Sequence, residues 1–411
     1  MSGTPRGAVW RLLGPAPPLG SAGPGRVVLS GGKNAALPLM LAAAGAPGAS
    51  RLLRLPTGLT DVDAAATLLR SAGCVLGDSP SAGGVADGPA IRSTPVLLAA
   101  LAGRHGVAET PAPGGCAIGE RSIRLHLEVM RAFGLDAREE GPRLRASGQL
   151  RPTRLQLPFP STTASQVAIV CAALAPGASR LTGLNLRAEN LGLLAALAAA
   201  GAEVRVTADG AEIVGPLARG LDVTVPATAD EALTWLIASL ITGGALEVEA
   251  AGVDDAQFAV LEAAGATLER VGQSVFRAAL LAPRPFSLRF GEPGGPGSDL
   301  HPLLAALALV LPGVSELVDI RFPQRTAYVE GLRRLGADVT LAAPGVVRVR
   351  GPAPLHGGAV DAADLRGGAA LLLAALVARG PVALRGVEQL ERGYEALPAR
   401  LRSLGVGLTV V

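Results

Sequence analysis

The stretch LRRLGADVTL, residues 332–341, decides the fold, because it joins a helical pattern to a strand pattern and then recurs along the chain. Leu332 and Leu335 lie three residues apart with charged residues between them, which indicates one apolar helix face. Gly336 follows, and glycine at this point is typical of a helix C-cap. The alternation after it indicates a strand. The stretch therefore predicts a helix that ends at glycine and returns the chain to a sheet.

Six copies of this pattern occur in the 411 residues. Their glycines are separated by 61 to 71 residues, a period too long for the usual solenoids. Six such units favour two domains of three units each. The alternative is a pair of ordinary α/β domains that share helix-capping habits. The glycines of the six copies are Gly73, Gly134, Gly201, Gly265, Gly336 and Gly405.

The composition narrows the class of protein. Hydrophobic residues make up 49% of the chain, enough for large cores, but aromatic residues only 3%. The net charge is +3 and no run of basic residues occurs, so we expect no nucleic-acid partner. Three cysteines and four histidines are dispersed, which argues against a disulfide framework and a metal site. The longest apolar run, near residues 302–314, is too short to span a membrane. We expect a cytoplasmic protein.

The segment SGGKNAALP, residues 30–38, contains the only lysine, Lys33, against 36 arginines. Lysine and arginine interchange at many surface positions, but arginine cannot replace a compact ammonium with three donors. Gly31 and Gly32 let the backbone approach a ligand, and Asn34 offers a donor and an acceptor. Phosphate is the obvious target for such a lysine. The alternative is a surface lysine retained by chance.

Four motifs extend this signal over most of the chain. They are GGKNAALP at 31–38, PGGCAIGERSIRLH at 113–126, DLRGGAALLLAALVARG at 364–380 and ERGYEALPARLRSLG at 391–405. In this order, and together with the sixfold repeat, they resemble the enolpyruvyl transferase family. Within it, the likeness is greatest to the UDP-N-acetylglucosamine 1-carboxyvinyltransferases, and the chain would be a divergent paralogue of these.

The resemblance implies an α/β fold of two inside-out α/β barrel domains (the EPSP synthase-like fold), each made of three repeated βαβαββ-like units. Residues 1–31 plus 226–411 would form the first, discontinuous domain, which carries the general base and the C-terminal arginines. Residues 32–225 would form the second, which carries the Lys33 and Cys116 motifs.

The resemblance also implies a reaction. The family moves the enolpyruvyl group of phosphoenolpyruvate to a secondary hydroxyl by addition and elimination, without a cofactor, in a cleft that closes on the acceptor. By this likeness Cys116 protonates C3 of phosphoenolpyruvate and is the target of fosfomycin. A thiol flanked by glycines and Arg121 suits that role, because nearby cations favour the thiolate. The other reading of Cys116 is a small apolar loop residue. The phosphoenolpyruvate ligands would be Lys33, Arg121, Arg366 and Arg392.

Asp299, in GSDLHP, matches the family's general base. A carboxylate near the acceptor hydroxyl must take its proton as the oxygen attacks. Asp at a helix start is also an ordinary N-cap, and the two roles are compatible. The remaining residues that the resemblance assigns to the acceptor are Asn34, Arg92, Ser161, Thr162, Thr163 and Arg325.

Three positions depart from the family pattern on the acceptor side. Phe159 stands near the place of a lysine that faces a diphosphate, Arg124 replaces an acidic residue, and Pro323-Gln324 replace Glu-Asn. Loss of the diphosphate lysine favours a smaller acceptor, such as UMP, in a specialised pathway such as nucleoside-antibiotic synthesis. The alternatives are UDP-N-acetylglucosamine in peptidoglycan synthesis and an inactive binding homologue. The sequence leaves the oligomeric state open.

Overall fold

The computed structural model describes residues 7–20, 25–74, 85–113, 122–292 and 294–411. The chain divides into two compact units. The terminal unit contains both ends of the chain, residues up to Ser30 and from Ala227 to Val411. The central unit begins at Gly31 and ends at Pro226. Each unit is described by itself below.

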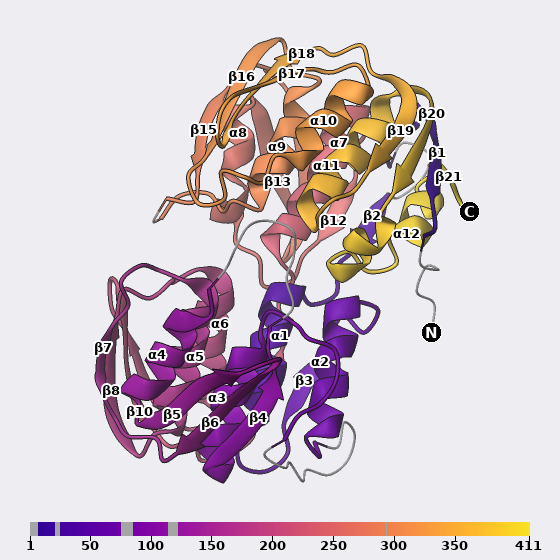
Figure 1. Ribbon diagram of the computed structural model, residues 1–411. Coiled ribbons are helices and arrows are strands. Elements are labelled where there is room, and N and C mark those ends of the chain that lie inside the picture. Colours follow the sequence, from indigo (N-terminus) through magenta and orange to yellow (C-terminus); the bar gives the residue numbers. More distant parts are fainter. Residues whose placement is uncertain (1–6, 21–24, 75–84, 114–121, 293) are drawn as a thin grey trace. The chain divides into compact units, whose positions relative to one another are not determined.

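The terminal unit alternates short strands with helices and two 3-10 turns (Figure 1). Its elements are β1 (Trp10–Gly14), β2 (Arg26–Val28), α7 (Ala229–Thr242), β12 (Glu247–Glu249), η1 (Asp255–Phe258), α8 (Val260–Ala263), β13 (Ala266–Gly272), β14 (Val275–Leu280), β15 (Ser287–Phe290), α9 (Leu300–Ala308), β16 (Gly313–Asp319), α10 (Ala327–Arg334), β17 (Asp338–Ala343), β18 (Val346–Gly351), β19 (His356–Asp361), α11 (Leu365–Val377), β20 (Arg379–Arg385), η2 (Val387–Arg392), α12 (Leu397–Ser403) and β21 (Gly407–Val410).

The central unit repeats the same alternation. Its elements are α1 (Lys33–Ala43), β3 (Arg51–Leu53), α2 (Thr60–Ser71), α3 (Thr94–His105), β4 (Val107–Pro111), α4 (Arg124–Ala132), β5 (Leu135–Glu140), β6 (Arg143–Gly148), β7 (Arg154–Gln156), α5 (Thr162–Leu174), β8 (Gly177–Thr182), α6 (Ala188–Ala199), β9 (Glu203–Val206), β10 (Gly210–Gly215) and β11 (Asp222–Thr224).

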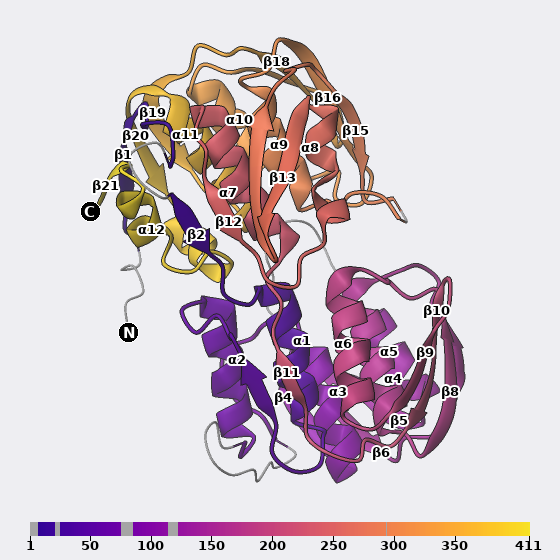
Figure 2. The same ribbon diagram turned by 180° about the vertical axis from the view of Figure 1, so that it is seen from behind.

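Each unit has helices at its centre and sheets outside. In the terminal unit α7, α9 and α11 pack against one another, and every residue of α11 from Leu365 to Leu376 is buried. In the central unit α1, α3 and α5 are nearly as apolar, and α3 packs against both of the others. A helix that is hydrophobic all round must be buried. Figures 1 and 2 show the strands of each unit around these inner helices, as the inside-out prediction requires.

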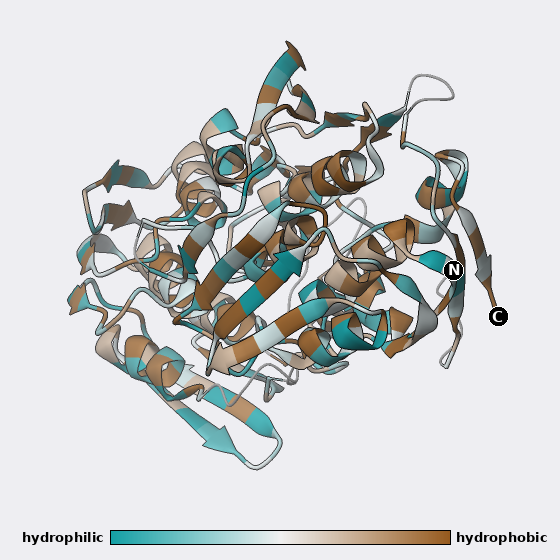
Figure 3. Cartoon of the chain, turned by 90° about the horizontal axis from the view of Figure 1, so that it is seen from above, coloured by the Kyte–Doolittle hydropathy of each residue, from teal (hydrophilic) through white to brown (hydrophobic). Residues whose placement is uncertain are grey.

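The described strands form six separate sheets, three in each unit, rather than one continuous barrel in each. In the terminal unit their orders are β19-β20-β1-β21, β13-β14-β12-β2 and β15-β16-β18-β17. In the central unit they are β7-β8-β10-β9, β4-β6-β5 and β11-β3. Apolar and polar bands alternate along several strands (Figure 3), as expected where one sheet face packs on helices and the other faces water.

The six repeat glycines all have positive φ, between 79° and 107°. Each follows a helix of the outer set, α2, α4, α6, α8, α10 or α12. An L-residue side chain is strained in this conformation, so glycine is the residue that ends the helix cheaply. Because each unit also has three sheets, the pattern read from LRRLGADVTL marks a structural repeat, and the alternative of a pair of ordinary α/β domains that share helix-capping habits is wrong.

Candidate active site

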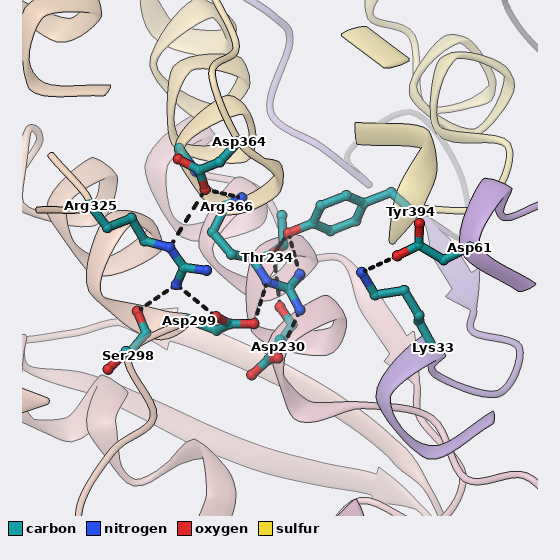
Figure 4. A network of polar contacts seen from close by, with 11 residues as sticks. Lys33, Asp61, Asp230, Thr234, Ser298, Asp299, Arg325, Asp364, Arg366 and Tyr394 are labelled. Carbon is teal, nitrogen blue, oxygen red and sulfur yellow. Dashed lines mark hydrogen bonds and ion pairs between the residues drawn. The ribbon is translucent and has the colours of Figure 1, made fainter. Parts of the chain in front are cut away.

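The first turns of the three inner helices of the terminal unit carry a cluster of charged side chains. Asp230 is the second residue of α7, Asp299 is the N-cap of α9, and Arg366 is the second residue of α11. Because α7, α9 and α11 pack together, their first turns present these side chains to one another (Figure 4). The threefold repeat thus brings residues 230, 299 and 366 together.

Asp299 occupies the N-cap position but makes no side-chain hydrogen bond to its own helix. Its Oδ1 instead accepts a hydrogen bond from Arg325 Nη1 at 2.7 Å, and its Oδ2 accepts one from Arg366 Nε at 3.2 Å. Asp364, the N-cap of α11, behaves differently, because its Oδ1 accepts from the backbone N–H groups of Arg366 and Gly367. Asp364 is an ordinary cap, and Asp299 is not.

Arg325 reaches Asp299 from the loop between β16 and α10. Its Nε lies 3.7 Å from Asp364 Oδ1, and its Nη1 also lies 3.4 Å from the Ser298 carbonyl oxygen. Asp319, at the end of β16, fixes the start of this loop, since its Oδ1 accepts from the Ser298 hydroxyl at 2.8 Å and from two backbone N–H groups. Arg325 is buried, so its orientation is set by these contacts.

Arg366 donates from all three of its nitrogens. Nε donates to Asp299, Nη2 to Asp230 Oδ2 at 2.7 Å, and Nη1 to the Tyr394 hydroxyl at 2.9 Å. The Tyr394 hydroxyl lies 2.9 Å from Thr234 Oγ1, which itself donates to the Asp230 carbonyl oxygen. The side chain of Arg366 is only 4% exposed, whereas those of Asp299 and Asp230 are 31% and 20% exposed. The carboxylates therefore form the accessible part of the cluster.

The arginines set the charge state of Asp299. Burial alone would raise the pKa of this carboxyl, but the guanidinium groups of Arg325 and Arg366 hold it below its usual range. Burial lowers the pKa of Arg366, and Tyr394, Asp230 and Asp299 more than reverse that effect, so its pKa stays well above the ordinary value. Asp299 is thus a fixed carboxylate whose basicity depends on how tightly the two arginines hold it.

In the central unit, Lys33 is the first residue of α1, and its Nζ lies 3.1 Å from Asp61 Oδ2 in the first turn of α2. Both side chains are mostly buried. Asn34 follows in the same first turn and is half-buried. A helix N-terminus favours anions, and a lysine placed there adds a second attraction for phosphate. Lys33 is therefore held in one place by Asp61 rather than extended into solvent.

The other sequence-predicted residues occupy first turns and loops. Arg92 precedes α3, and burial together with the Arg92 charge lowers the pKa of His126 to about 4. Ser161 is the N-cap of α5, and Thr162 Oγ1 accepts from Asn185 Nδ2 at 3.1 Å. Thr163 follows Thr162 in α5, and Arg392 ends η2, where its Nη1 lies 3.3 Å from Gln389 Oε1.

Two predicted residues, Cys116 and Arg121, lie outside the described residues. The other two cysteines are described. Burial raises the pKa of the Cys171 thiol far above its ordinary value, and burial also raises that of Cys74, against the opposing charge of Arg104. Neither environment favours a thiolate. Within the described residues no group of three or more His, Cys, Asp or Glu could hold a metal ion, and no helix there is long and apolar enough to cross a membrane.

Comparison with known proteins agrees with this architecture. The pattern of the EPSP synthase (3-phosphoshikimate 1-carboxyvinyltransferase) family matches residues 20–401. The chain belongs to this family. A UDP-N-acetylglucosamine 1-carboxyvinyltransferase of Anaeromyxobacter sp. (strain Fw109-5) is 33% identical to it over 407 residues, which cover 93% of this chain and 95% of that protein. One from Mesorhizobium japonicum is 33% identical and covers 93% and 96%.

Solved structures give the same fold. The enolpyruvyl transferase NikO from Streptomyces tendae superposes with a TM-score of 0.85 at 25% identity, over 99% of both chains. EPSP synthase from Acinetobacter baumannii superposes with a TM-score of 0.73 at 18% identity, over 98% of this chain and 100% of that one. The predicted EPSP synthase-like fold is confirmed. This chain is an enolpyruvyl transferase that uses phosphoenolpyruvate as donor.

Sequence reasoning missed several members of this enolpyruvyl transferase's clusters, among them Asp61, Asp230 and Tyr394. Asp230 and Asp61 lie in first turns of helices, where acidic residues are common, so nothing in the sequence distinguishes them. Tyr394 stands in the ERGYE motif beside Arg392, and that position could have marked it. The pairing of Asp299 with Arg366 needs α9 and α11, helices from different repeats, to pack, which spacing alone does not reveal.

Proposed function

We propose that this enolpyruvyl transferase moves the enolpyruvyl group of phosphoenolpyruvate to a secondary hydroxyl of a uridine nucleotide, with UMP as the acceptor. One observation carries the proposal. Asp299 stands at a helix start but does not cap it, and two buried arginines hold its partly exposed carboxylate in place. A carboxylate that is fixed, ionised and accessible is what deprotonation of an acceptor hydroxyl needs.

The reaction follows by addition and elimination. The acceptor hydroxyl gives its proton to Asp299 as its oxygen bonds to C2 of phosphoenolpyruvate, while Cys116 delivers a proton to C3. The tetrahedral adduct then returns a proton from C3 to the Cys116 thiolate and expels phosphate, which takes the proton held by Asp299, and an enol ether is left on the acceptor. Atoms balance without any cofactor.

Binding of phosphoenolpyruvate suits this step. Its anionic groups compete with Asp299 for Arg366, and a looser contact with this arginine makes the Asp299 carboxylate more basic. The residues proposed to bind phosphoenolpyruvate are Lys33, Arg121, Arg366 and Arg392. Those proposed for the acceptor are Asn34, Arg92, Ser161, Thr162, Thr163 and Arg325.

The choice of UMP rests on the acceptor-side departures. Phe159, near the place of the family's diphosphate lysine, is 43% exposed, so this surface offers an apolar ring and not a cation. Position 124 also lacks the acidic side chain of the family. Arg124 stands there, exposed in α4 and paired with Glu128 at 2.7 Å. A single phosphate makes fewer demands on this surface than a diphosphate. We place the reaction in specialised metabolism such as nucleoside-antibiotic synthesis.

UDP-N-acetylglucosamine is the second candidate acceptor. The relatives from Anaeromyxobacter and Mesorhizobium, both 33% identical, carry its name. That acceptor would place the enzyme in peptidoglycan synthesis. An inactive homologue is the third reading, and retention of Lys33, Cys116, Asp299 and Arg392 together weighs against it.

Phosphate release from phosphoenolpyruvate, measured side by side with UMP, with UDP-N-acetylglucosamine and without an acceptor, tests the proposal. We expect a higher kcat/KM with UMP. A higher value with UDP-N-acetylglucosamine would assign the cell-wall acceptor instead, and no release with either would leave the inactive homologue.

A further inference from the structure

Asp230 pairs with the same arginine as Asp299, the proposed general base. Arg366 Nε donates to Asp299 Oδ2 at 3.2 Å and Arg366 Nη2 donates to Asp230 Oδ2 at 2.7 Å. In a guanidinium, Nε and Nη2 form the edge that pairs with one carboxylate through two parallel hydrogen bonds. Here two different protein carboxylates divide that edge between them (Figure 4).

The rest of Arg366 is also engaged. Its Nη1 donates to Tyr394, and its side chain is almost fully buried. A substrate carboxylate that is to pair with the Nε/Nη2 edge must therefore displace one of the two aspartates. Asp230 has the shorter contact, 2.7 Å against 3.2 Å, so it holds the arginine more firmly than Asp299 does.

The charges around the arginines lead to the same conclusion. Arg325 and Arg366 bring two positive charges, and Asp230, Asp299 and Asp364 bring three negative ones. The arginines are thus neutralised before any substrate binds. Phosphoenolpyruvate adds more negative charge, and the Asp230 carboxylate, paired with Arg366, opposes it.

We propose that Asp230 is a positioning residue that shares Arg366 with Asp299. By binding Nη2, it prevents Asp299 from pairing with both Nε and Nη2 of the guanidinium. Its negative charge also weakens the binding of phosphoenolpyruvate. The inference rests on the proposed function, because it takes Asp299 as the base and Arg366 as a phosphoenolpyruvate ligand. It gives Asp230 two opposite effects. Its charge preserves the basicity of Asp299, which raises kcat, and repels the anionic donor, which raises KM.

The Asp230→Asn variant tests this split. Asparagine keeps the size of the side chain and an oxygen for Arg366 Nη2 but removes the charge. We expect kcat and the KM for phosphoenolpyruvate both to fall, each about fivefold, as for a partly exposed charge pair. A merely structural role would misplace Arg366 and raise KM instead. A KM that rises or stays constant, or an unchanged kcat, would overturn the inference.

Two further variants sharpen the result. Asp338→Asn removes a carboxylate that pairs with Arg350 at 3.1 Å on the exposed face of the same unit, and we expect it to change neither constant. Arg366→Lys removes the shared edge, so adding Asp230→Asn to it should lower kcat little further, since Asp230 acts on Asp299 through that edge. Additive losses of kcat in the double variant would show that Asp230 does not act through Arg366.

Calorimetric binding of phosphoenolpyruvate without an acceptor separates this inference from the proposed function. The wild type and Asp230→Asn are compared directly, and we expect about fivefold tighter binding by the variant. This outcome does not depend on which acceptor the enzyme uses. Failure of UMP as an acceptor would thus refute only the proposed function, and equal or weaker binding by the variant would refute only the role of Asp230.

Discussion

Asp299 and Arg325 are joined by a 2.7 Å hydrogen bond, and both belong to the repeat of the terminal unit that runs from β15 to β18. The contact takes the Asp299 carboxylate away from the backbone of α9, where an N-cap aspartate would ordinarily be bound. Together with Arg366, Arg325 also holds the pKa of Asp299 below its usual range against the opposing effect of burial, so the carboxylate is ionised at neutral pH. Loss of its charge is therefore not what limits activity at neutral pH.

Replacement of Lys33 by arginine should remove most turnover although the charge is kept. Lys33 is mostly buried and fixed by Asp61 at 3.1 Å, so the wider guanidinium has no room to reproduce the position of Nζ. An error of about 1 Å can cost on the order of 100-fold in rate. Steady-state kinetics of Lys33→Arg give the answer, with Arg51→Lys, an exposed residue paired with Asp222, as the matched exchange. A variant with wild-type kcat/KM would show that Lys33 was retained by chance and has no role in turnover.

Fosfomycin should alkylate Cys116 and spare the other two cysteines. Attack on the epoxide needs a thiolate, and burial disfavours the thiolate at both Cys171 and Cys74. The adduct should form faster when the true acceptor is present, because the family resemblance implies a cleft that closes on the acceptor. Intact mass and peptide mapping, with Cys116→Ser as the control, identify the site. An adduct on another cysteine, or none with any acceptor, would take Cys116 out of the proposed mechanism.

Glu231, next to Asp230 in α7, should make stability depend on pH. Burial raises its pKa from 4.5 to about 7, although Arg400, 3.5 Å away, opposes the shift. Between these values the unfolded chain has lost the proton that the folded protein still holds, so stability falls as pH rises from about 4.5 to 7 and then levels off. The full effect is on the order of 3 kcal/mol.

Urea unfolding of the wild type and Glu231→Gln at pH 5 and pH 8 checks this expectation. Glutamine stays neutral, so the variant should gain stability relative to the wild type at the higher pH. Glu269→Gln, at an exposed position of β13, controls for a general loss of charge. Parallel pH profiles for Glu231→Gln and the wild type would contradict the shift.

Alanine substitutions at two glycines, one within α6 and one just after it, should change the stability of the protein in opposite directions. Gly192 lies inside α6 with no atom within 4 Å of an added Cβ, so Gly192→Ala should stabilise the protein by about 0.5–1 kcal/mol. Gly201, after the same helix, has φ +107°, and an added Cβ would lie 2.6 Å from Ala218 Cβ. Gly201→Ala should cost about 1–3 kcal/mol. Chemical denaturation measures the free energy of unfolding of both variants. A Gly201→Ala protein as stable as the Gly192→Ala protein would show that the repeat does not require glycine at position 201.

The fold could be predicted well from the sequence because the repeat is determined by residues that are close together in the chain. A helix face followed by Gly201 or Gly336 depends only on near neighbours, and both glycines have the expected positive φ. The two clusters of charged side chains were harder to predict from the sequence. Lys33 was identified by its rarity, but its partner Asp61 looked like any acidic residue in a first turn. Asp230 was missed for the same reason, because only the packing of α7 against α11 brings it to Arg366.

Phosphate release by the Asp299→Asn variant with phosphoenolpyruvate and UMP tests the central claim most directly. Asparagine retains the shape of the side chain but cannot accept the hydroxyl proton as a base. We expect kcat to fall by about 100- to 10,000-fold, the range for loss of a general base, while calorimetry still shows phosphoenolpyruvate bound. An Asp299→Asn enzyme that releases phosphate at the wild-type rate would contradict the account.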